Sequence, residues 1–171
     1  QPGQKLLHDY QLRRITGWLH PETEALGIMY QQNNSVLSIA SGKLYGKLLM
    51  DGLSENRNYN SVDVIESDFV WAPISEEFGF IGALLVTAVL FFIIYKCFKT
   101  AQKADNAFGR YICVGVGAMM LFHAFENIGM CIGLMPVTGI PLPFVSYGSS
   151  FMVVNFVMLG LINSVWVHSG R

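Results

Sequence analysis

Three long apolar runs occupy the second half of the chain. The first is "FGFIGALLVTAVLFFIIYKCF", residues 78–98, the second covers residues 111–134, and the third covers residues 144–167. An α-helix needs roughly 20 apolar residues to cross a bilayer, and each run reaches that length. We therefore predict an all-α integral membrane protein with transmembrane helices at these three positions.

The residues before the first run are more polar but carry weaker helical patterns. In "LLHDYQLRRITGWL", Leu12, Ile15 and Leu19 recur at helical spacing, which suits a short helix lying in the interface plane of the membrane. A second apolar pattern, "SVLSIASGKLYGKLLMDG", is interrupted by Gly42 and Gly46. This part of the chain is predicted to form a large loop with short helices.

Basic residues between the first two runs set the predicted orientation. Four cations face a single acid there, namely Lys96, Lys99, Lys103 and Arg110 against Asp105. Because short loops rich in Lys and Arg stay in the cytoplasm, residues 99–110 and 168–171 are predicted to be cytoplasmic. Residues 1–77 and 135–143 then face outward. Since nothing in the polar segment could carry it across a membrane, we expect further helices before Gln1.

Composition narrows the function classes. Hydrophobic residues make up 52% of the chain and charged residues 13%, against roughly a quarter charged in soluble domains. A net charge of −1 argues against nucleic acid as a partner, because phosphate binding needs a basic surface. Cys97, Cys113 and Cys131 lie within or at the end of apolar runs, so we expect buried thiols and no disulfide framework.

The stretch "PVTGIPLPFVSYGSS", residues 136–150, separates the last two runs and contains three prolines and two glycines. Non-helical backbone near membrane depth is tolerated only where protein or a water-filled cavity surrounds it. We therefore predict a folded-back loop that shapes a cavity wall. The hydroxyls of Ser146, Tyr147 and Ser149 could contact a ligand, but a structural role is favoured because small polar residues commonly join membrane helices.

Carboxylates gather just before the first run, in "ESDFVWAPISEEFGFIG". Asp68 has an acidic neighbour, Glu66, and is followed by the apolar "FVW". Partial burial and a like charge nearby both increase a carboxylate's affinity for a proton, which makes it a better general base. The alternative is that Asp68 caps the helix that follows, since Asp is a preferred N-cap residue. Glu76 and Glu77 suit the positive end of that helix dipole.

The blocks "YQLRRI", "SGKLYGK", "ESDFVWAPISEEFGFIG" and "NIGMCIGLMPVTGIPLPFVSYGSS" resemble the SEDS family of shape, elongation, division and sporulation proteins, which includes RodA and FtsW. The resemblance covers nearly the whole chain, and its last two blocks are highly specific. The residues "ENIGM" and "GIPLPFVSYG" are nearer to the RodA branch. It implies a ten-helix membrane fold, of which this chain would hold the last three helices and the large outer loop.

The same resemblance implies a function. Members of the family are peptidoglycan glycosyltransferases that polymerise lipid II into glycan strands at the outer face of the cytoplasmic membrane, and their partner is a class B penicillin-binding protein, a transpeptidase. The segment by itself is expected to be inactive. The alternatives are a lipid II flippase and a non-catalytic scaffold of the elongation or division machinery.

The resemblance assigns the catalytic aspartate to Asp68. The substrate-binding candidates are Lys47, Glu66, Ser146, Tyr147 and Ser149. Lys47 is the first candidate for the diphosphate of the lipid, with Arg13 and Arg14 as weaker ones, because lysine binds phosphate as a flexible point charge. The alternative is a lysine that faces solvent or lipid headgroups. A divalent cation, Mg²⁺ or Mn²⁺, could share the diphosphate charge, but no metal-ligand spacing is diagnostic.

Four positions depart from the family pattern. Ser149 stands where the family usually has glycine, and Glu66 stands where a histidine is frequent. Lys43 and Leu48 also occupy positions often held by glycine. Since glycine is valued where the backbone takes a positive φ or approaches another group closely, these departures concern the geometry of the loops.

The middle run contains "HAFEN". His123, Glu126 and Asn127 are spaced so that they share one helix face. An ionisable group inside a membrane span is costly and normally faces protein. We predict that this face is buried, with Glu126 hydrogen-bonded to His123 or to a helix that precedes this segment.

The predicted topology can be tested by cysteine labelling in spheroplasts of cells that express the intact protein. A membrane-impermeant reagent is expected to modify cysteines placed at Asn58 and Thr138 but not at Lys103, because the basic loop stays inside. Labelling at position 103 without labelling at position 58 would reverse the orientation and place Asp68 on the cytoplasmic side.

Overall fold

The computed structural model describes residues 9–20, 28–50 and 68–169, and all regular secondary structure in these ranges is helical. The helices are α1 (Asp9–Leu19), α2 (Ile28–Gly42), α3 (Gly46–Met50), α4 (Trp71–Lys103), α5 (Ala107–Cys131) and α6 (Ser149–His168). The breaks predicted at Gly42 and Gly46 are confirmed as the end of α2 and the start of α3.

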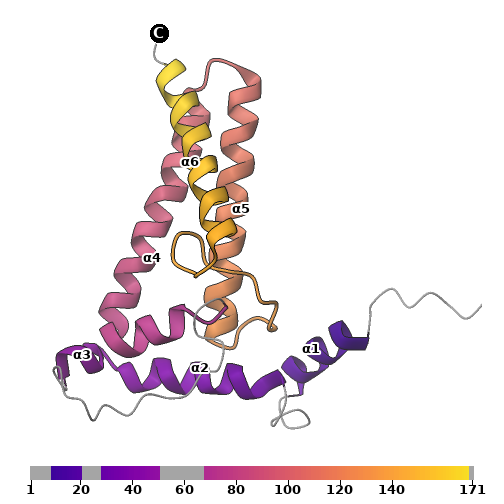
Figure 1. The fold of residues 1–171 in the computed structure, drawn as a ribbon, viewed down its shortest axis with the longest axis vertical. Coiled ribbons are helices and arrows are strands. Elements are labelled where there is room, and N and C mark those ends of the chain that lie inside the picture. Colours follow the sequence, from indigo (N-terminus) through magenta and orange to yellow (C-terminus); the bar gives the residue numbers. More distant parts are fainter. Residues whose placement is uncertain (1–8, 21–27, 51–67, 170–171) are drawn as a thin grey trace, which may run out of the picture.

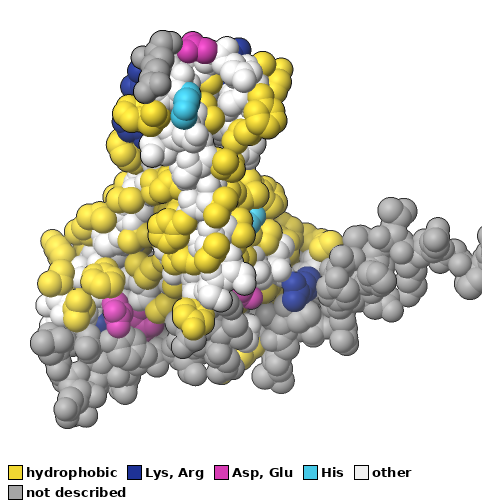
Figure 2. Space-filling model, turned by 45° about the horizontal axis from the view of Figure 1, so that its top comes forward, with side chains coloured by type: hydrophobic (Ala, Val, Ile, Leu, Met, Phe, Trp, Pro, Cys, Tyr) yellow, Lys and Arg dark blue, Asp and Glu magenta, His cyan; other side chains and the backbone are white. Residues whose placement is uncertain are grey.

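The long helices α4, α5 and α6 run side by side, and α2 and α1 lie across the lower end of this bundle (Figure 1). Each long helix is long and apolar enough to cross a membrane. Hydrophobic side chains cover the middle of the column, while Lys, Arg, Asp and Glu gather toward its two ends (Figure 2). This distribution matches a bilayer core between two polar interfaces, so the prediction of an all-α membrane protein is confirmed.

The helix bounds refine the predicted ones. α4 begins at Trp71 but is broken at Gly79 (φ 68°, ψ −170°), next to the predicted start of the first span at Phe78. α4 also continues to Lys103, and α5 begins at Ala107, where the side-chain oxygen of Asn106 accepts a hydrogen bond from the Phe108 N–H at 3.1 Å. Part of the predicted 99–110 loop is therefore helical.

The third helix starts later than the predicted residue 144. Phe144 has a φ of 62°, which is incompatible with a right-handed helix, and α6 begins only at Ser149 after Gly148 as its N-cap. The irregular segment between α5 and α6 is correspondingly longer. It turns back from the end of α5 toward the base of α6 (Figure 1), as predicted for a folded-back loop.

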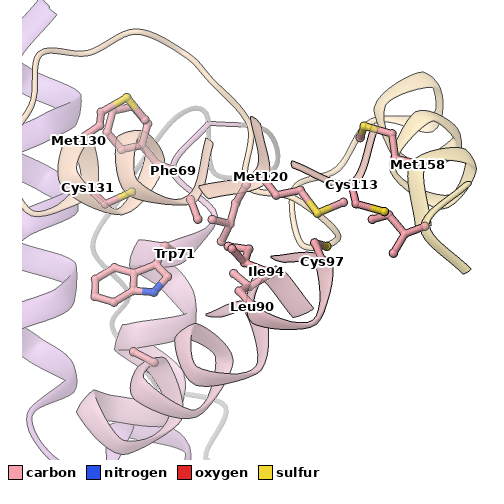
Figure 3. Packing of buried hydrophobic residues seen from close by; sticks show 14 of the residues in the cluster. Phe69, Trp71, Leu90, Ile94, Cys97, Cys113, Met120, Met130, Cys131 and Met158 are labelled. Atoms are coloured by element: carbon pink, nitrogen blue, oxygen red, sulfur yellow. The ribbon is translucent and has the colours of Figure 1, made fainter. Parts of the chain in front are cut away.

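Apolar side chains from the three long helices form one core. Leu90, Ile94 and Cys97 of α4 pack in a cluster with Met120 of α5 and Met158 of α6 (Figure 3). All three cysteines are free and buried, which confirms the expectation from the sequence. The core holds α4 and α5 together and includes Phe69, the residue that directly follows Asp68.

The break in α4 is matched by the connection between α2 and α3. Because Gly79 is not helical, the N–H groups of Phe80 and Ile81 are released from the helix, and they donate to the carbonyls of Lys43 (2.9 Å) and Leu44 (3.3 Å). Gly46 lies so close that an added Cβ would be 2.1 Å from the Glu77 carbonyl oxygen. The motifs "SGKLYGK" and "EEFGFIG" are therefore joined by backbone hydrogen bonds and close backbone packing, which we call the backbone interlock.

Lys43 takes the left-handed conformation, with a φ of 49°, directly after α2 ends. This position is one where glycine carries no steric cost. The departure from the family pattern at Lys43 therefore leaves the backbone path intact and places a strained residue in it.

A buried acid adds a second connection at this junction. Glu76 is 1% exposed and forms a salt bridge with Lys47, and it accepts hydrogen bonds from Ser38 and from Ser41, the latter at 3.2 Å. Breaking a buried pair by removing one partner is strongly destabilising because a charge stays behind without compensation. The cluster ties α2 and α3 to the first part of α4.

Gly46→Ala is expected to destabilise the protein by more than about 2 kcal/mol. The left-handed conformation alone costs a residue with a Cβ roughly 1–2 kcal/mol, and the clash with Glu77 adds to it. Lys43→Gly, three residues away, is the matched comparison and should stay within about 1 kcal/mol of wild type, since it relieves the same kind of strain. The measurement is the thermal unfolding midpoint of the purified intact protein. Equal midpoints for the two variants would contradict the backbone interlock.

Candidate functional site

Asp68 lies in a turn that ends just before α4. The N-cap residue of α4 is Val70, and no side chain makes a cap hydrogen bond there. The alternative in which Asp68 caps this helix is therefore wrong. Asp68 is half-buried, the next residue, Phe69, is buried, and among the described residues no hydrogen bond or ion pair engages the Asp68 carboxylate. The acid is held in place by its backbone, and its side chain remains available.

The folded-back loop covers the Asp68 carboxylate. Gly139 has a φ of +76°, and a methyl group on its Cα would place the new carbon 3.0 Å from Asp68 Oδ2 and 3.7 Å from Cγ. Glycine thus serves two needs here, because the backbone is left-handed and the carboxylate approaches closely. The loop forms one wall of the site around Asp68.

Asn127 of α5 connects this wall to Asp68. Its Nδ2 donates to the main-chain carbonyl of Asp68 at 2.7 Å and to the carbonyl of Ile140 at 2.8 Å. The Asn127 side chain is completely buried. Residues from the turn before α4, from α5 and from the loop therefore meet at one amide group.

Other side-chain donors also hold the same loop. They come from α1 and α2 and pair with carbonyls at the end of α5 and in the loop. The bonds are Arg14 Nη1 to Thr138 (3.3 Å), Trp18 Nε1 to Gly133 (3.2 Å), Gln32 Nε2 to Met130 (2.9 Å) and Met135 (2.8 Å), and Ser35 Oγ to Cys131 (2.9 Å). The last carbonyls of a helix have no partner inside the helix, so these donors also complete α5.

The three substrate-binding candidates in the loop lie in different surroundings. Ser146 is buried, and its Oγ accepts a hydrogen bond from the Leu142 N–H at 2.7 Å, which favours the structural role. Tyr147 is 76% exposed. Ser149 is exposed and is the first residue of α6. Its φ is not positive, so a serine in place of the family's glycine causes no backbone strain there. Direct contact of these hydroxyls with a substrate stays a prediction.

The remaining candidates are distributed as follows. Lys47 is held by the buried carboxylate of Glu76, so it has a structural role whether or not it also binds a diphosphate. Glu66 lies outside the described residues. In residues 9–20, 28–50 and 68–169, no group of three or more His, Cys, Asp and Glu side chains is placed to hold a metal ion. Binding of Mg²⁺ or Mn²⁺ stays a prediction.

The helix face predicted in "HAFEN" is buried at Glu126 and Asn127, as expected. His123 instead stacks on Phe151 of α6, with 5.8 Å between ring centroids. Within the described part of the chain, no hydrogen bond joins Glu126 to His123, so that expected pair does not form there. The spacing of the motif identified Asn127 as inward-facing, but its partners, 59 residues before it and 13 after it, could not be read from the sequence.

The chemistry available at this site is proton acceptance by a carboxylate. Asp68 is partly shielded from water, its backbone is fixed, and cationic Arg14 is bonded to the residue next to Gly139. A positioned carboxylate can act as a general base, and a nearby cation can stabilise negative charge on a leaving group.

Known proteins are similar to this chain in sequence and in fold. Peptidoglycan glycosyltransferase MrdB of Escherichia coli K12 is 35% identical over 163 residues, which cover 95% of this chain and 44% of that protein. Peptidoglycan glycosyltransferase RodA of Treponema pallidum is 32% identical over 95% of this chain and 37% of its own length. The chain thus spans less than half the length of these curated relatives.

A solved structure shows the same arrangement of helices. It belongs to a peptidoglycan synthase complex that coordinates polymerization and crosslinking, and one of its chains matches with a TM-score of 0.75 and 25% identity over 96% of this chain and 44% of that chain. The profile of the FtsW, RodA and SpoVE cell cycle proteins matches residues 4–170. The chain therefore belongs to the FtsW/RodA/SpoVE family of cell cycle proteins.

Proposed function

We propose that the intact protein is a peptidoglycan glycosyltransferase that polymerises lipid II at the outer face of the cytoplasmic membrane, with Asp68 as its general base. The observation that carries this proposal is the half-buried Asp68 carboxylate, which caps no helix and lies against Gly139 of the folded-back loop. Support comes from relatives named peptidoglycan glycosyltransferases that match 95% of this chain.

The proposed reaction needs one proton acceptor. The 4-hydroxyl of the acceptor sugar gives its proton to the Asp68 carboxylate while its oxygen forms a bond to the anomeric carbon of the donor. The bond between that carbon and the lipid diphosphate breaks, and the diphosphate leaves with the electron pair. Because a diphosphate is a good leaving group, little acid assistance is required, and a single base suffices.

Negative charge develops on the diphosphate as it leaves, so cations near Asp68 matter. Arg14 donates one hydrogen bond to Thr138, and a guanidinium carries five N–H donors in all. Lys47 is held by Glu76, which fixes the direction of its ammonium group. The helices α1 and α3, which carry Arg14 and Lys47, lie at opposite ends of α2 (Figure 1), so the two residues are separate candidates for the diphosphate and do not form one site. A cation that is already held in position loses little freedom on binding.

The direction in which the site faces and its partner belong to the same proposal. α1 and α2 lie at the end of the bundle opposite the basic connection between α4 and α5 (Figure 1), and the positive-inside rule therefore supports a position of Asp68 on the outer side of the cytoplasmic membrane. The matched structure comes from a complex that couples polymerization to crosslinking. A class B penicillin-binding protein, which crosslinks the new strands, is the corresponding partner here.

Asp68→Asn is expected to reduce glycan polymerisation from lipid II by on the order of 10²- to 10⁴-fold, the usual cost of removing a general base. Asparagine keeps the size of the side chain and leaves the backbone contact with Asn127 intact, so the protein should insert and fold normally. The measurement is the length and amount of polymer made by the purified intact protein together with its transpeptidase.

The matched control is Asp105→Asn, which changes an exposed acid at the opposite end of the bundle and should leave polymerisation unchanged. Glu66→Gln should have a milder effect than Asp68→Asn, since Glu66 is assigned only a tuning role. Near-native polymerisation by Asp68→Asn would refute the catalytic assignment. If the unmodified protein makes no polymer, movement of labelled lipid II between leaflets would favour a flippase, and its absence would favour a scaffold.

A second experiment separates the two roles of Lys47. Lys47→Met should lower stability by about 3–5 kcal/mol, because Glu76 keeps a buried charge without its cation. Adding Glu76→Gln removes that charge and should restore most of the unfolding midpoint. If Lys47 also binds the diphosphate, the double variant keeps a raised KM for lipid II. A native KM in the stable double variant would limit Lys47 to its structural role.

A further inference from the structure

We propose that Asn127 is a positioning residue for glycosyl transfer: its amide sets the place of the Asp68 carboxylate relative to the loop that covers it. The inference rests on the proposed role of Asp68 as general base. It concerns a side chain of α5 that need not touch the substrate, and its argument comes from the contacts of that side chain with the two segments that form the site.

The amide group of Asn127 uses one nitrogen for two carbonyls. A side-chain amide has two N–H donors, and here one carbonyl belongs to Asp68 and the other to Ile140, at 2.7 and 2.8 Å. Both distances are at the short end of the range for N–H···O hydrogen bonds. Because Asn127 is 0% exposed, water does not replace either bond without opening the structure.

These two hydrogen bonds fix the main chain of Asp68 and the main chain of the loop at Ile140, and so the position of the Asp68 carboxylate relative to the loop. Asp68 is fixed through its own main chain, while its carboxylate makes no hydrogen bond to another described residue. Ile140 directly follows Gly139, the residue against which Asp68 Oδ2 lies. Moving either carbonyl away from Asn127 therefore changes the position of the carboxylate relative to the loop. A misplacement of about 1 Å can cost on the order of 10²-fold in rate.

α5 is a rigid support for such a positioning residue. It is a long helix that packs against α4 and α6, and neighbours of Asn127 on the same helix, Ala124 and Met130, belong to the buried core. Sites built on rigid elements hold geometry more precisely than sites built on loops. The turn before α4 and the folded-back loop are irregular, so the helix amide is the rigid reference between them.

The chain also contains a matched comparison, Gln32 of α2. Its Nε2 likewise donates to two carbonyls, those of Met130 and Met135, and the side chain is 3% exposed. Gln32 thus has the same chemistry and burial as Asn127, but neither of its partners is Asp68 or a neighbour of Gly139. Substituting Gln32 disturbs the same end of α5 and the start of the same loop without releasing the Asp68 backbone.

The experiment compares Asn127→Ala, Asn127→Gln and Gln32→Ala in the purified intact protein with its transpeptidase. Polymerisation is measured against lipid II concentration, below the unfolding midpoint of each variant and at equal folded protein. Asn127→Ala should lower kcat by about 10²-fold and change KM by less than about 3-fold, because positioning of the base acts on the transition state. Asn127→Gln keeps both donors on a longer side chain and should fall between Asn127→Ala and wild type. Gln32→Ala should lower the midpoint but keep kcat within about 3-fold.

A double-mutant cycle tests whether Asn127 acts through Asp68. In an Asp68→Glu background the carboxylate is already displaced, so adding Asn127→Ala should lower kcat by less than about 3-fold. The effects of Gln32→Ala and Asp68→Glu on the free energy of activation should instead add. A native kcat in folded Asn127→Ala, or full additivity with Asp68→Glu, would overturn the positioning role. Full activity of Asp68→Asn would instead refute the base itself, so the two failures are distinguishable.

Discussion

The structure around Asp68 depends on one constraint: irregular backbone at the end of a membrane bundle must have its polar groups paired. The segment after α5 contains prolines and left-handed residues, so its backbone cannot pair in the regular pattern of a helix. Its carbonyls, and the last carbonyls of α5, instead accept hydrogen bonds from the side chains of Arg14, Trp18, Gln32 and Asn127. An unpaired buried carbonyl would be costly, so these donors hold the loop in one conformation.

The helices α1 and α2 thereby support the loop, although the hydrogen bonds that their side chains donate to it do not reach Asp68 itself. They supply donors to the loop, and Asn127 of α5 supplies another. α2 is itself fixed to α4 by the close approach of glycines and by the buried pair of Glu76 and Lys47. α4 thus holds α2, and α2 holds the start of the loop, while Asn127 of α5 joins the loop to Asp68.

The sequence predicted the parts of this arrangement that are local. Apolar run length identified the long helices, and glycine positions identified the break between α2 and α3. The start of α6 was predicted too early, because an apolar residue such as Phe144 gives no sign of its positive φ. The pairing of Asn127 with Asp68 was not readable, because it joins residues whose separation in sequence carries no periodic signal.

The use of the nearby donors also explains why the Asp68 carboxylate lacks a hydrogen-bond donor among the described residues. Hydrogen bonds to the charged form stabilise a carboxylate and reduce its tendency to accept a proton. Around Asp68, the amide of Asn127 is committed to main-chain carbonyls, and the residue facing Oδ2 is a glycine, which offers no side chain. The same pairing that satisfies the irregular backbone therefore keeps donors away from the carboxylate. In this fold, the hydrogen bonds that hold the loop in place are also the ones that leave the Asp68 carboxylate without a donor among the described residues.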